Sequence, residues 1–265
     1  MAERRLSKRR RGAVRPSPIF LAFVGAAVVA GWFAWRDNGV GSRGGDFAVF
    51  VMVTALWVVS LSIHEFGHAY AAYRAGDRSV EAAGYLTLNP FKYAHPVLSI
   101  LLPLFFIVQG GIGLPGGAVY LHPHTFRSRL SRSLAAAAGP LSNVAFAAIT
   151  LALVHGHLDS DHGRFWSGLA FFGFLQVTAA VLNLLPIPGL DGWAIIEPYL
   201  SADTVRGAEP IKPWGMLGVI VLLQIDGVQR KFFDTVYGIY DWSGVPRFAA
   251  QLGREVFRFW QKFPA

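Results

Sequence analysis

The chain of 265 residues is 53% hydrophobic and only 15% charged, and it contains 21 Phe and 8 Trp. A soluble domain of this length does not need so much apolar surface, so the composition indicates a membrane protein with several spans. The absence of cysteine excludes disulfides, cysteine-ligated zinc and thiol catalysis. The formal charge of +8 could indicate nucleic-acid binding. The basic residues, however, lie beside apolar segments, so we interpret them as signals of membrane orientation and expect no nucleic-acid partner.

The N-terminal segment combines a basic tail with an apolar run. Residues 1–15 carry seven Arg or Lys and one acid, and they are expected to stay in the cytoplasm. Residues 19–35 are about long enough to span a bilayer once. A cleavable signal peptide is the alternative, but no small-residue cleavage site follows closely. The segment is therefore predicted to be an uncleaved first span, followed by an external turn over residues 37–46.

The second apolar run, residues 47–73, contains the sequence His-Glu-x-x-His at residues 64–68. His64 and His68 are four residues apart, so they share one face of a helix and can bind one metal ion. Glu65 is the only charged residue of the run and lies close enough to handle a proton of the attacking water. The motif is short enough to arise by chance. A carboxylate deep in an apolar helix nevertheless costs about 2.5–3.5 kcal/mol, which favours a functional role.

Residues 79–122 have no clear helical pattern. Residues 79–95 look irregular or strand-like, and Asn89-Pro90 forms a break. Residues 96–122 are too few for two ordinary spans between cytoplasmic flanks, which predicts a re-entrant segment, with residues 118–121 as a possible strand. His95, His122 and His124 are expected to lie at the membrane interface rather than to bind metal.

Two further spans are predicted at residues 133–154 and 165–185, joined by an external loop at residues 155–164. Asn143 in the third span is of a type that commonly forms a hydrogen bond between helices. Beyond the fourth span, Pro186, Pro188 and Gly189 break the helix and place Asp191 at the depth of the two histidines. Asp191 can cap a helix over residues 192–200 or serve as a third metal ligand, and neither role excludes the other.

These motifs together resemble the site-2 protease family of intramembrane zinc metalloproteases. The resemblance rests on His64-Glu65-Phe66-Gly67-His68, on Asn183-x-x-Pro186-x-x-x-x-Asp191-Gly192 and on Gly139-x-x-x-Asn143, and it covers about residues 47–195. Leu86-Thr87-Leu88-Asn89-Pro90 is similar to the bacterial branch. His95-Pro96 departs from the Asp-Pro of many relatives. No PDZ or CBS domain is recognised.

The resemblance implies a core of three helices that binds zinc through His64, His68 and Asp191. It further implies that Glu65 is the general base and that Asn143 stabilises the oxyanion. The expected reaction is hydrolysis of peptide bonds in a single-span membrane protein, near the cytoplasmic face and within regulated intramembrane proteolysis. Residues 82–88 or 118–121 could offer a strand edge to an unwound substrate.

The sequence thus predicts an all-α polytopic membrane protein with about 4–6 transmembrane helices and a short strand-like or re-entrant segment. We expect one membrane-embedded domain over residues 1–265, with residues 1–15 as tail and 47–195 as catalytic core. Residues 214–225 are expected to form a short or partial span, and residues 230–265 an interfacial tail. A bacterial plasma membrane with a cytoplasmic N-terminus is the expected location. The alternatives are a non-catalytic scaffold of the same fold and, more weakly, a zinc or proton transporter.

Overall fold

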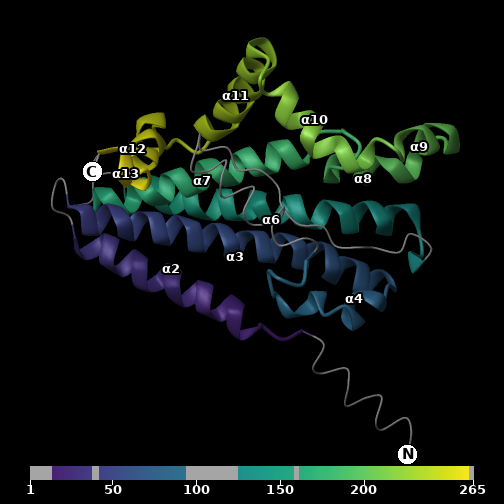
Figure 1. Ribbon diagram of the computed structural model, residues 1–265, viewed down its shortest axis with the longest axis horizontal. Coiled ribbons are helices and arrows are strands. Elements are labelled where there is room, and N and C mark those ends of the chain that lie inside the picture. The colour runs from purple at the N-terminus through teal and green to yellow at the C-terminus, as the bar shows by residue number, and fades with distance from the viewer. Residues whose placement is uncertain (1–13, 38–41, 94–124, 158–160, 263–265) are drawn as a thin grey trace, which may run out of the picture.

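The computed structural model describes residues 14–37, 42–93, 125–157 and 161–262, and over these residues it is all-helical, with no strand (Figure 1). The long helices are α2 (Pro18–Arg36), α3 (Arg43–Ala75), α6 (Arg129–His155) and α7 (Gly163–Asn183). The shorter α-helices are α4 (Ser79–Ala82), α8 (Asp191–Ile196), α9 (Ala202–Ala208), α10 (Gly215–Leu222), α11 (Asp226–Asp241), α12 (Arg247–Phe257) and α13 (Phe259–Lys262). Three 3-10 turns, η1 (Tyr85–Thr87), η4 (Glu197–Tyr199) and η5 (Lys212–Trp214), complete the described elements.

The four long helices are each long and apolar enough to cross a membrane, which confirms the four predicted spans. All four run roughly parallel in Figure 1. α7 is the most buried of them and α2 the least, so α7 lies at the centre of the bundle and α2 at its edge. The helices extend past the apolar runs because polar caps start them. Ser42 Oγ accepts a hydrogen bond from Gly45 N (3.2 Å) at α3, and Ser128 and Ser131 form a capping box at α6.

α3 and α6 pack with their backbones in close contact. A Cβ on Gly67 would stand 2.9 Å from the carbonyl oxygen of Ala138, so the two helices can approach this closely only because residue 67 is glycine. Small residues thus bring the histidine face of α3 directly against α6, and this contact positions the site.

The C-terminal helices return the chain to the opposite end of the bundle. Gly215, at the start of α10, lies against the carbonyl of Pro188, beyond the end of α7. Gly253 in α12 lies against the carbonyl of Ser167, near the beginning of α7. α10 and α11 therefore arch over α7 from one end to the other (Figure 1). Residues 214–225, which are predicted to form a short or partial span, belong to this part of the chain.

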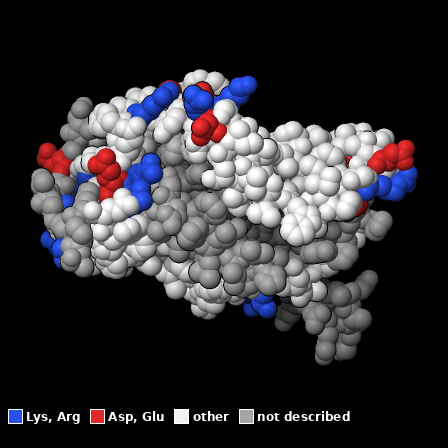
Figure 2. Space-filling model, turned by 45° about the horizontal axis from the view of Figure 1, so that its top comes forward, with Lys and Arg blue, Asp and Glu red and all other residues white. Residues whose placement is uncertain are grey.

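The tail packs on the bundle instead of standing apart from it. Phe257 at the end of α12 is fully buried, and its ring packs against Phe50 of α3 and Phe171 of α7. The remaining outer face of the tail is free to lie at the membrane interface, which stays a prediction. Figure 2 shows charged side chains in small groups of both signs, separated by broad uncharged surface.

The expectation of a strand at residues 82–88 is wrong. Residues 79–82 form α4 and residues 85–87 form η1. Gly84 (φ 79°) and Leu88 (φ 55°) take left-handed backbone conformations on either side of η1, which extended strands do not allow. The predicted re-entrant segment at 96–122, the possible strand at 118–121, and His95, His122 and His124 all lie outside the described residues.

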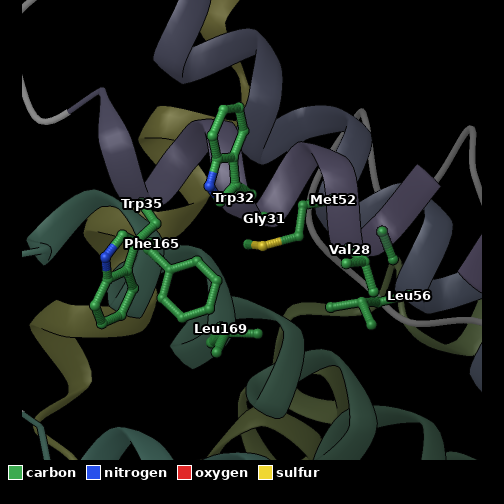
Figure 3. A pocket seen from close by; sticks show the side chains of 9 residues that line it. Val28, Gly31, Trp32, Trp35, Met52, Leu56, Phe165 and Leu169 are labelled. Atoms are coloured by element: carbon green, nitrogen blue, oxygen red, sulfur yellow. The ribbon is translucent and has the colours of Figure 1, made fainter. Parts of the chain in front are cut away.

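An apolar cavity of about 480 Å³ lies between α2, α3 and α7 (Figure 3). Trp32 and Trp35 of α2, Met52 of α3, and Phe165 and Leu169 of α7 belong to its lining. No acidic or basic side chain lines it, and it includes none of the predicted site residues.

Candidate metal centre

The structure brings His64, His68 and Asp191 together. One ligand atom from each residue lies within 4.8 Å of the others, and this is the one such group of three or more among the described residues. The two histidine Nε2 atoms are 3.1 Å apart. Asp191 Oδ2 lies 3.2 Å from His64 Nε2, and Asp191 Oδ1 lies 3.3 Å from His68 Nε2. Both histidines are buried in α3, and Asp191 is the first residue of α8.

The outer nitrogens of both imidazoles are engaged by α6. His68 Nδ1 lies 2.8 Å from the carbonyl oxygen of Ala135, which can only accept, so His68 must donate from Nδ1. His64 Nδ1 lies 2.6 Å from Asn143 Oδ1 and donates to it. In the neutral imidazoles, both Nε2 atoms therefore carry lone pairs that point toward Asp191.

This donor set fits a metal ion. Two imidazole lone pairs and a carboxylate converge in a buried space, and such an arrangement is stabilised by a cation between them. Gly139 of α6 leaves the room: a Cβ there would stand 2.2 Å from His68 Nε2 and 2.7 Å from His64 Nε2. Two histidines and one carboxylate are a ligand set of catalytic zinc sites, which keep a fourth position open.

Glu65 lies beside this group without belonging to it. Its side chain is 3% exposed, and its Oε2 atom is buried with no hydrogen-bond partner among the described residues. A buried carboxylate oxygen that none of the described groups occupies can bind a water molecule or accept a substrate proton. The role of Glu65 as a general base stays a prediction.

Curated relatives match most or nearly all of the chain. "Putative zinc metalloprotease Rip2" of Mycolicibacterium smegmatis is 49% identical over 94% of this chain and 96% of its own length. The protein of the same name in Mycobacterium tuberculosis (strain ATCC 25618 / H37Rv) is 47% identical over the same shares. "Putative zinc metalloprotease YwhC" of Bacillus subtilis is 33% identical over 62% of this chain and 76% of its own length. No protein-family model and no solved structure matches the chain.

The chain belongs to the site-2 protease family of membrane zinc metalloproteases. Its cofactor is zinc, which the buried group of His64, His68 and Asp191 is suited to hold. The four apolar helices make this site-2 protease a multi-pass membrane protein.

Asn143 connects this site-2 protease's first histidine to α7. Its Oδ1 accepts from His64, and its Nδ2 donates to Gln176 Oε1 at 2.8 Å. The hydrogen bond between helices that the sequence suggested is therefore present. An oxyanion role for the remaining N–H of Asn143 stays a prediction. Sequence reasoning missed Gln176, although an amide in the middle of a largely apolar span was a signal.

Asp191 does not cap α8, because Leu190 precedes it as the N-cap and no side chain caps the helix. The broken end of α7 supports it instead. A Cβ on Gly192 would stand 2.3 Å from the carbonyl oxygen of Leu184, so α8 begins in direct contact with the residues that follow α7. This close packing leaves the Asp191 carboxylate free to face the histidines.

The far end of α8 is held by Glu197, which sequence reasoning also missed. Its carboxylate is buried and bonds to Arg132 Nη2, to Lys212 Nζ (2.9 Å) and to Trp193 Nε1 (2.9 Å). Burial opposes ionisation, but the hydrogen bond and charge of Lys212, with those of Arg132, lower the pKa of Glu197 below its ordinary value. Ser133 Oγ also donates to Ile195 O (2.6 Å). α6 therefore orients the two histidines through Ala135 and Asn143, and it holds α8 in place through Arg132 and Ser133.

The histidines of the predicted external loop do not form a metal site in the described structure. His157 Nδ1 lies 2.8 Å from Leu153 O, and the His162 ring stacks on Trp35 with centroids 3.6 Å apart. These two side chains pack against the ends of helices, as structural residues do. The grouping of three potential ligands occurs only at His64, His68 and Asp191 within the described ranges.

Proposed function

We propose that this protein hydrolyses peptide bonds within the membrane-spanning segments of single-span proteins, near the cytoplasmic face. The observation that carries the proposal is the convergence of Asp191 with two buried histidines of α3, a helix of membrane length. Beside them, Glu65 Oε2 has no hydrogen-bond partner among the described residues. His64 lies 11 residues before Ala75, the end of α3, so about 16 Å of helix separates it from that end. The site is thus well inside the bundle.

His64, His68 and Asp191 would hold the zinc ion. When bound, zinc acts as a Lewis acid, which acidifies a water molecule and polarises a peptide carbonyl. Ala135 and Asn143 fix the two imidazole rings, so the ligand geometry exists before substrate arrives.

Glu65 performs the proton transfers. Its free Oε2 takes a proton from the attacking water, and the protonated carboxyl then gives that proton to the nitrogen that leaves. The low polarity around Glu65 strengthens its interactions with the attacking water and with the leaving nitrogen, because few other water molecules compete with them. A substrate helix has to unwind locally at the site, since a helical peptide bond is hydrogen-bonded and hidden.

The orientation that places this reaction near the cytoplasm follows from the basic segments. The positive-inside rule assigns two basic segments to the cytoplasm. They are residues 1–15 and the start of α6 with Arg127, Arg129 and Arg132. The membrane is proposed to be a bacterial plasma membrane, as the relatives come from bacteria. The physiological setting is proposed to be regulated intramembrane proteolysis.

The test is to reconstitute the protein in liposomes with a tagged single-span substrate and to map the new termini by mass spectrometry. We expect cleavage inside the substrate span, in its cytoplasmic half, and complete inhibition by a membrane-permeant zinc chelator. Cleavage only in the soluble flanks of the substrate would refute an intramembrane reaction. Cleavage that resists the chelator would refute a metalloprotease.

A further inference from the structure

Gln176 is a fully buried amide in the middle of α7, at 0% exposure. A primary amide buried inside a membrane span is strongly destabilising if its polar atoms have no hydrogen-bond partners. The partners of Gln176 therefore show what the residue does. One lies on α6 and the other on α3.

Four hydrogen bonds form one continuous chain through three helices. Ser60 Oγ donates to the carbonyl oxygen of Trp57 at 2.9 Å, within α3. Gln176 Nε2 donates to Ser60 Oγ at 2.9 Å. Asn143 Nδ2 donates to Gln176 Oε1 at 2.8 Å, and Asn143 Oδ1 lies 2.6 Å from His64 Nδ1. Ser60, Asn143 and Gln176 are all at most 4% exposed, so water does not compete for these bonds.

The donor and acceptor roles in this series of hydrogen bonds are fixed at the bond between Ser60 and Trp57. A backbone carbonyl has no proton, so Ser60 must donate to Trp57, and its oxygen is then left to accept from Gln176. Gln176 must consequently present its NH₂ to Ser60 and its oxygen to Asn143. Asn143 in turn presents its NH₂ to Gln176 and its oxygen to His64. Turning either amide around would oppose two donors or two acceptors in a buried place.

We infer that Gln176 and Ser60 are positioning residues that set the tautomer of His64. An Asn side chain can offer a histidine either an oxygen or an NH₂ group, and only the oxygen requires the proton to be on Nδ1. With the proton on Nδ1, the lone pair of Nε2 faces Asp191 and is available to zinc. His68 needs no such relay, because a carbonyl, that of Ala135, fixes its tautomer directly.

The inference rests on the proposed zinc site and is tested by zinc affinity, measured on the full-length protein in detergent by competition with a chromogenic chelator. Gln176→Leu keeps the volume but removes the acceptor of Asn143, so we expect zinc to bind about 10–100-fold more weakly. Gln176→Glu keeps an oxygen toward Asn143 in either protonation state, so it should bind zinc nearly as the wild type does. Ser60→Ala frees the Gln176 amide to turn and should weaken zinc binding several-fold.

Thr178→Val is the matched control. Thr178 is also fully buried on α7, but its hydroxyl donates to Phe174 of its own helix at 2.9 Å and takes no part in the chain of bonds. Cooperative thermal unfolding of each zinc-free variant, checked before the zinc titration, separates loss of positioning from loss of fold. Where Gln176→Leu does not fold, Ser60→Ala and Gln176→Glu carry the comparison.

Several outcomes would overturn the inference. Wild-type zinc affinity in a folded Gln176→Leu protein would show that the amide is only structural, and the proposed function would be untouched. An equal loss in Thr178→Val, or in Gln176→Glu, would show that packing and not the donor direction matters. A wild-type protein that binds no zinc would remove the inference and the proposed function together.

Discussion

The backbone of Gly67 lies so close to Ala138 that a Cβ on residue 67 would stand 2.9 Å from the Ala138 carbonyl oxygen. The next residue of α3, His68, donates a hydrogen bond to the carbonyl oxygen of Ala135, which lies on α6 as Ala138 does. The close approach of α3 and α6 is thus what allows a backbone group of α6 to orient a histidine of α3.

Gly67→Ala should separate α3 from α6 and weaken zinc binding. The added methyl group meets backbone, which cannot rotate away, so we expect a loss of about 1–3 kcal/mol in stability. Gly25→Ala is the control, because a Cβ at Gly25 of α2 meets nothing within 4 Å. Thermal unfolding in detergent and zinc titration measure both effects. An unchanged melting temperature and zinc affinity in Gly67→Ala would contradict the packing described here.

Asp191→Ala should lose most of the bound zinc, because two histidines alone form an incomplete site. Asp226→Ala is matched to it: Asp226 is the first residue of α11, as Asp191 is of α8, and it belongs to no group of potential ligands in the described structure. Metal content by mass spectrometry after dialysis should give about one zinc per chain for wild type and Asp226→Ala. Full occupancy in Asp191→Ala would show that Asp191 is not a ligand.

Glu197 should stabilise the fold in a pH-dependent way. Its folded pKa is lowered, so its contribution is present above the unfolded pKa of about 4.5 and is lost as pH falls from there through the lower folded value. Glu197→Gln should therefore cost about 1.5–3 kcal/mol at pH 7 and less in strong acid. The comparison uses chelator-treated protein, so that zinc loss does not contribute.

Glu209→Gln serves as the control for that measurement. Glu209 also bonds to Lys212, at 2.8 Å, but its side chain is 59% exposed, so its removal should change stability little. A stability difference between wild type and Glu197→Gln that stays constant from pH 7 into strong acid would refute the ionised network.

Introduced cysteines test the orientation in a chain that has none of its own. Asp161→Cys, at the start of α7, should react with an impermeant thiol reagent from outside, and Arg129→Cys, at the start of α6, only from the cytoplasm. Arg254→Cys should behave like Asp161→Cys, because Gly253 contacts Ser167 near the beginning of α7. Labelling of position 161 only from the cytoplasm would invert the topology and move the site to the outer face.

The sequence was sufficient for the parts of the structure that depend on local pattern. The four apolar runs became helices, and the spacing of His64 and His68 placed them on one face. The strand expected at residues 82–88 failed because alternating Tyr85, Leu86 and Thr87 suit a strand as well as a 3-10 turn. The left-handed conformations of Gly84 and Leu88 on either side decide in favour of the 3-10 turn.

The contacts of the supporting residues could not be predicted from the sequence alone. Gln176 lies 33 residues from Asn143 and 116 from Ser60, and their contact depends on how three helices rotate about their axes. The same holds for Glu197 and Arg132, which are 65 residues apart. A motif identifies the ligands, whereas their outer partners follow from the tertiary packing.

The most direct test of the central claim is the rate at which Glu65→Gln cleaves a single-span substrate in liposomes. The substitution keeps the size and helix preference of the side chain but removes the base, so cleavage should fall by about 10²–10⁴-fold. Zinc content and folding should stay at wild-type levels because Glu65 is not in the ligand group, whereas His64→Ala should lose both metal and activity. A zinc-loaded Glu65→Gln protein that cleaves at the wild-type rate would contradict the account.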